Sequence, residues 1–120
     1  MVDASILKHL RAICLALPDA TEGAGWGNPT FRVHERVFAM HHIRDGRPSL
    51  WCMVPLGLRE AIVDIDPERF FVPRHNTHQA WIGIWLDVDV DWEHVADLVA
   101  DSYSYAAPKK LAQLLNPDAS

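Results

Sequence analysis

Apolar positions recur at the helical spacing near both ends of the chain. At the N-terminus they form one stripe that Pro18 ends: Ile6, Leu7, Leu10, Ile13, Cys14 and Leu17. Near the C-terminus a second stripe predicts a helix from about Trp92 to about Ala107, with Asp91 as its N-cap. Pro108 cannot extend that helix comfortably, so a short last helix is expected over Lys109–Leu115.

Between these helices the apolar positions alternate, which is typical of strands. Residues 31–54 predict a three-stranded meander, with a tight reversal at His34-Glu35-Arg36 and a hairpin at Asp45-Gly46. A short helix is expected over Pro55–Asp64. The short apolar run at Phe70-Phe71 is expected to form a fourth strand. The segment Thr21–Thr30 holds three alternate glycines but no Gly-Lys-Ser/Thr ending, so we interpret it as a flexible or bulged edge segment rather than a phosphate loop.

The run Trp81–Leu86 is apolar on both faces of a strand. Our hypothesis is that Ile82, Ile84 and Leu86 face the helices, which sends Trp81 and Trp85 to the opposite face; an inside-out register would exchange the two sets. That opposite face is either covered as well or kept for a partner.

The order of elements is helix, three-stranded meander, short helix, two strands and two helices. This order predicts a single α+β domain spanning residues 1–120. Its antiparallel sheet has about five strands, and helices from both chain ends pack on one face.

Composition narrows the class of protein. Hydrophobic residues make up 49% and charged residues 22% of 120 residues, which is typical of a globular chain. There is no long apolar span, no secretory signal and only two cysteines, so we expect a cytoplasmic protein that does not contact a membrane. The net charge of −5 argues against nucleic-acid attraction over the whole surface, although a local basic patch is compatible with it.

Metal binding and catalysis find little support in the sequence. His75 and His78 share a loop, yet no cysteine or carboxylate stands at a familiar ligand spacing. His41 and His42 are neighbours on a strand and point to opposite faces. Asp87–Asp91 resembles the start of a calcium loop, but its sixth position is tryptophan instead of glycine. We expect no metal, no cofactor and no enzyme activity.

Arginines flank both turns of the meander. Arg32 and Arg36 flank the first turn, and Arg44 and Arg47 flank the second. They form either a pair of basic wings or ordinary charges on solvated turns.

Several segments together resemble the MmcQ/YjbR family. They are Leu17–Glu22, Pro29–Val33, Val37–Ala39, Phe70–Asp87 with its histidine-rich loop, and Ser102–Leu111. The resemblance extends over nearly the whole chain and implies a frataxin/CyaY-like fold. It also implies a DNA-binding role through a double-wing arrangement, with the wings at the turns around His34-Glu35 and Asp45-Gly46.

Two functions therefore stay open. In the first, the chain binds DNA weakly and in a salt-dependent way; the contacts would be Arg32, Arg36, Arg44, Arg47, Arg74, Lys109 and Lys110. In the second, a tryptophan-lined sheet face binds a small ligand or a protein partner; its residues would be Trp51, Met53, Arg74, His75, Asn76, Trp81 and Trp85. The alternative is that these tryptophans are plain core. The chain is expected to be a monomer or a weak homodimer.

Overall fold

The computed structural model describes residues 4–25, 28–55, 57–73 and 81–115. These residues form an α+β fold, in which one antiparallel sheet has the strand order β1-β2-β3-β4-β6-β5. In chain order the elements are α1 (Ala4–Leu15), β1 (Ala20–Gly25), β2 (Asn28–Val33), β3 (Arg36–Arg44), β4 (Arg47–Met53), α2 (Arg59–Ile65), β5 (Phe70–Phe71), β6 (Trp81–Trp85), α3 (Trp92–Ala106) and α4 (Lys109–Leu115). Within the described ranges, no helix has the length and apolar character that crossing a membrane requires.

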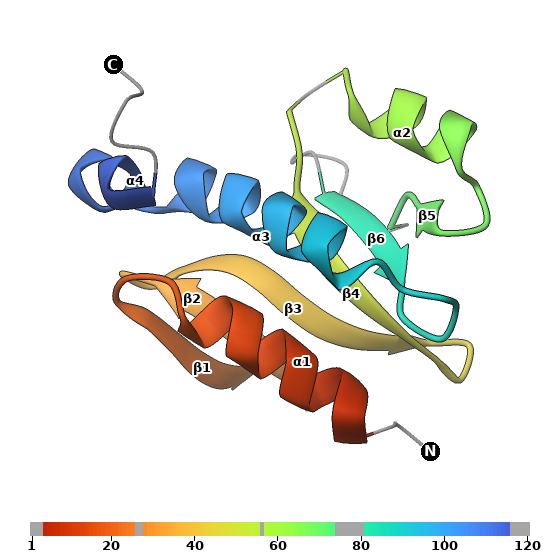
Figure 1. Ribbon diagram of the computed structural model, residues 1–120, viewed down its shortest axis with the longest axis horizontal. Coiled ribbons are helices and arrows are strands. Elements are labelled where there is room, and N and C mark those ends of the chain that lie inside the picture. The colour runs from red at the N-terminus through yellow and green to blue at the C-terminus, as the bar shows by residue number, and fades with distance from the viewer. Residues whose placement is uncertain (1–3, 26–27, 56, 74–80, 116–120) are drawn as a thin grey trace.

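Helices α1 and α3 lie across the same face of the sheet (Figure 1). Under them the side chains of neighbouring strands meet in register, with Ile82 beside Cys52 and Ile84 beside Leu50. All four are buried in the core, as is Leu86. The predicted orientation of the Trp81–Leu86 run is therefore confirmed, because its aliphatic side chains face the helices.

The sheet has six strands and not about five, because the glycine-rich segment after α1 is itself a strand. β1 pairs with β2 along its whole length, from Ala20 opposite Val33 to Gly25 opposite Asn28. Glycine and alanine leave no alternation of apolar and polar side chains, so the pairing partner rather than the local pattern makes this segment a strand. The expectation of an edge segment was right, but that of a merely flexible or bulged lead-in was wrong.

α3 begins where the sequence predicts. The Asp91 carboxylate accepts hydrogen bonds from the backbone amides of Glu93 and His94, at 3.1 and 3.2 Å. Near its other end the Tyr103 hydroxyl donates to the carbonyl of Pro18 over 2.6 Å, and its ring meets Phe38 edge-on. These contacts fix the C-terminal half of α3 against both the sheet and the segment that follows α1.

Candidate functional site

The two arginine-flanked turns are hairpins, as predicted, but they lie at opposite ends of β3. His34 and Glu35 form the β2–β3 turn with positive φ angles of 47° and 73°, and Asp45 and Gly46 form the β3–β4 turn with 53° and 77°. β3 has nine residues, so the two tips are separated by roughly 30 Å. The four arginines therefore belong to two separate surfaces.

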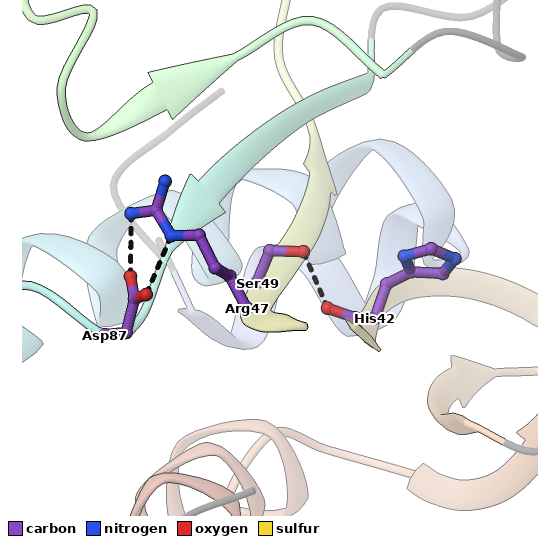
Figure 2. Close-up of polar contacts among 4 residues, drawn as sticks. All are labelled: His42, Arg47, Ser49 and Asp87. Atoms are coloured by element: carbon purple, nitrogen blue, oxygen red, sulfur yellow. Dashed lines mark hydrogen bonds and ion pairs between the residues drawn. The ribbon is translucent and has the colours of Figure 1, made fainter. Parts of the chain in front are cut away.

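At the β3–β4 turn both arginines are engaged within the molecule. Arg47 donates to both carboxylate oxygens of Asp87, at 2.7 and 2.9 Å (Figure 2). Its guanidinium also lies over the Trp85 ring at 3.9 Å from the centroid, while that of Arg44 lies over Phe71 at 4.8 Å. The hydrogen bond from Arg47 holds the pKa of Asp87 below its ordinary value, so the pair is ionised at neutral pH.

At the β2–β3 turn the arginines have no partner among the described residues. Neither Arg32 nor Arg36 has an ion pair or a side-chain hydrogen bond to any part of the chain that the structure describes. The nearby carboxylate of Asp19 is bonded to His34 at 3.0 Å. Glu35, in the turn itself, is exposed.

The junction of α3 and α4 comes to the same end of the molecule. Ala106, Ala107 and Pro108 line a cavity of about 270 Å³ together with His34 and Arg36. The exposed Lys109 and Lys110 follow directly at the start of α4, and Figure 1 shows α4 on the side where β3 begins. We call Arg32, Arg36, Lys109 and Lys110 the basic end.

A larger cavity of about 650 Å³ adjoins the basic end, where β3 begins, β4 ends and β6 begins. We call it the Arg36 cavity; its lining residues are Arg36, Val37, Met40, Met53, Trp81, Tyr105 and Ala106. Val37 and Met40 are three residues apart and would point to opposite faces of a regular strand. They share the cavity because the pairing of β2 and β3 shifts register between Phe31 and Arg32.

Ser102 holds α3 in place over this irregularity. Its hydroxyl donates to the carbonyl of Phe38 over 2.6 Å and accepts from the amide of Met53 over 2.8 Å. One buried side chain thus satisfies a backbone group on β3 and another on β4. The same contacts place Tyr105, one turn of helix further on, beside the cavity.

The register brings the sequence-predicted tryptophans together on the sheet face opposite the helices. Trp51 lies beside Gly83, and Met53 beside Trp81. Trp51 and Trp81 are only 9% and 4% exposed, and Trp85 is half-buried.

The molecule itself fills much of this aromatic face. Phe71 covers Gly83 and packs on Trp85 at 4.3 Å between ring centroids, while His42 stacks on Trp51 at 4.5 Å. Arg74, His75 and Asn76, the expected polar rim and one expected DNA contact, lie outside the described residues.

Burial shifts the protonation of several groups. It lowers the pKa of His41 and His42, aided by the charge of His42 on His41 and of Arg44 on His42. It raises the pKa of both thiols, Cys14 and Cys52, to about 12, so both are protonated.

His41 and His42 point to opposite faces, as expected: His41 lies beside Leu50 and His42 beside Ser49. Over the described ranges, no three histidine, cysteine or acidic residues gather in a way that could hold a metal ion.

Sequence reasoning missed most of the Arg36 cavity, namely Val37, Met40, Tyr105 and Ala106, together with Ser102, which positions it. A signal existed only for Ser102, a polar residue on the buried stripe of α3 that also carries Val95, Val99 and Ala106. A buried hydroxyl on an apolar stripe indicates a specific hydrogen-bond partner.

Fold and site define a small α+β protein with an antiparallel sheet and a basic end whose arginines have no ion pair with a described residue. The chain belongs to the YjbR family, whose sequence model matches residues 15–105. No curated protein is significantly similar to it.

Solved structures that share the fold include the following two. One is the Deinococcus radiodurans protein DR2400, with the domain DUF419; it is 24% identical with a TM-score of 0.71, over 82% of this chain and 76% of that one. The other is a Pseudomonas syringae protein, 13% identical with a TM-score of 0.66, over 88% of this chain and 99% of that one.

Proposed function

We propose that this YjbR-family chain binds DNA through the basic end, in a binding role without catalysis. The observation that carries the proposal is the difference between the two hairpins. Arg32 and Arg36 have no ion pair with a described residue, whereas Arg47 is bound to Asp87. A free guanidinium can take a phosphate oxygen without first breaking an internal contact.

The position of the two lysines supports this assignment. The α3–α4 junction lies against the β2–β3 turn, so Lys109 and Lys110, which follow it directly, add two further charges at the same end of the molecule as Arg36. Phosphate contacts of this kind release counterions, and they supply binding that depends little on sequence. A net charge of −5 is compatible with such binding because binding depends on local charge, and Asp19, one of the acids at this end, is already bonded to His34.

Fluorescence anisotropy of labelled DNA at low salt tests the proposal with paired variants. Arg32→Gln/Arg36→Gln should weaken binding about tenfold or more, because each lost phosphate contact costs on the order of 1 kcal/mol. The matched control is Arg69→Gln, whose guanidinium is paired with Asp66 next to β5, at the far edge of the sheet. Equal losses in both variants, or no binding by the unaltered chain, would reject the proposal.

A small-ligand module is the second candidate, and the Arg36 cavity is the observation that favours it. Its volume of about 650 Å³ falls among those of small-molecule sites, roughly 300–1,000 Å³. The aromatic face itself is a poorer candidate, since Phe71 and His42 already pack against its rings. Thermal-shift screening with small organic anions separates the candidates: a Tm rise abolished by Arg36→Gln, without DNA binding, favours the ligand module.

A further inference from the structure

We propose that the Arg36 cavity receives one unpaired nucleotide of a DNA strand, with its phosphate on Arg36 and its base against Tyr105 and the neighbouring methionines. The inference rests on the proposed DNA binding and adds to it a preference for single strands. What carries it is the juxtaposition of a free guanidinium with an aromatic and thioether lining in one cavity.

The described lining combines one charged residue with apolar and aromatic ones. Arg36 is the one charged residue among the described lining residues, and it is exposed and without an ion pair there. The other described lining residues are apolar or aromatic: Val37, Met40, Met53, Trp81, Tyr105 and Ala106. Such a cavity favours a ligand that carries a negative group at one end and an apolar ring at the other.

The lining suits a flat ring in particular. Tyr105 is 49% exposed, so its ring is available to a ligand without displacing core packing. Met40 and Met53 are half-buried, and their flexible, polarisable thioethers adapt well to an aromatic surface. Burial and the charge of Asp101 raise the pKa of Tyr105, so its hydroxyl stays a neutral hydrogen-bond donor.

The geometry favours a single strand over a duplex. A base inside a duplex is stacked and paired, and extruding it costs a few kcal/mol, whereas the bases of a single strand are accessible. The two hairpin tips are also too far apart, at roughly 30 Å, to act as one clamp. The free charges therefore gather beside a cavity of nucleotide size and not along a duplex groove.

Anisotropy competition against three chains of equal length, about a dozen nucleotides, tests the inference. They are oligothymidylate, the same phosphate backbone without bases, and a duplex. Oligothymidylate should bind about tenfold more tightly than the abasic chain, since stacking of one base on an aromatic side chain contributes on the order of 1 kcal/mol or more of binding free energy. The duplex should bind like the abasic chain.

Tyr105→Ala should remove most of the preference for bases while leaving affinity for the abasic chain unchanged. Ile65→Ala, which truncates an 85%-exposed side chain on α2, serves as the control and should preserve the preference. If all three chains bind equally, the inference is wrong while the proposed function stands. If none binds, the proposed function itself fails.

Free thymidine monophosphate is added as a competitor to distinguish a nucleotide within a strand from a free one. It should compete weakly, because it carries only one of the phosphates that the basic end can contact. Competition as effective as that of oligothymidylate would overturn the assignment to a strand.

Discussion

Arg47 and Asp87 are 40 residues apart in sequence, yet they form a two-point ion pair that ties the β3–β4 turn to the end of β6. Both side chains are partly exposed, at 41% and 32%, so the pair stabilises the fold by at most about 1 kcal/mol. The larger effect of the pair is that it occupies the Arg47 guanidinium. Because this group is held against Asp87 and Trp85, it is not free to bind a phosphate.

Arg47→Gln should therefore leave DNA affinity almost unchanged. Arg36→Gln, at the other hairpin, removes the same charge from a side chain that has no described partner, and it should weaken binding. Anisotropy under identical salt compares the two variants directly. A loss for Arg47→Gln as large as that for Arg36→Gln would show that both hairpins contact DNA.

Gly83→Ala should destabilise the fold by roughly 1–3 kcal/mol, because overpacking forces neighbouring groups to move. A Cβ at Gly83 would overlap with Cζ of Phe71. The control is Gly23→Ala on β1, where the nearest atom, Thr30 Oγ1, lies at 3.5 Å, an ordinary contact. Urea denaturation measures both; similar unfolding free energies for the two variants would contradict the packing of Phe71 over Gly83.

Ser102→Ala should cost about 1–3 kcal/mol of unfolding free energy, because the Met53 amide and the Phe38 carbonyl lose their buried partner. Ser104→Ala is the matched control: Ser104 is exposed, and its hydroxyl donates to the carbonyl of Ala100 within its own helix. That change should stay within about 0.5 kcal/mol. Equal effects in the two variants would mean that the Ser102 contacts contribute nothing to stability.

Stability should fall as the pH drops below about 6.5, the ordinary pKa of histidine. Burial lowers the pKa of His41 and His42 in the folded chain, so below that pH the unfolded chain binds more protons. The loss should continue until the pH passes below the lowered values. Urea denaturation from neutral to mildly acidic pH checks this, and His41→Leu should flatten the curve. An unchanged pH profile in that variant would exclude His41 as a cause.

The sequence was sufficient to predict those structural features that depend on the residue pattern of one short segment. The alternation along Trp81–Leu86 separated the aliphatic face of β6 from the tryptophan face, and the hypothesis that the aliphatic face meets the helices is confirmed. Asp91 marked the start of α3. The Asp45-Gly46 pair marked a hairpin, since its geometry needs positive φ angles. Each of these features depends on neighbours within a few residues.

Features that depend on distant partners could not be predicted. β1 has little strand signal of its own and forms by pairing with β2. The Arg36 cavity requires the register shift of β2 on β3 and the position of α3 that Ser102 fixes. Likewise, the residues around Arg47 give no sign that it pairs with Asp87, which is 40 residues away. From the sequence alone, the arginines of the two hairpins are therefore indistinguishable.

The salt dependence of DNA binding tests the central claim most directly. For single strands the slope of log K against log salt is about −0.7 per phosphate contact, and for duplex DNA about −0.9. Arg36→Gln should make the slope shallower by about one such contact, and Arg47→Gln should leave it unchanged. A slope that changes with Arg47 and not with Arg36 would contradict the assignment of DNA binding to the basic end.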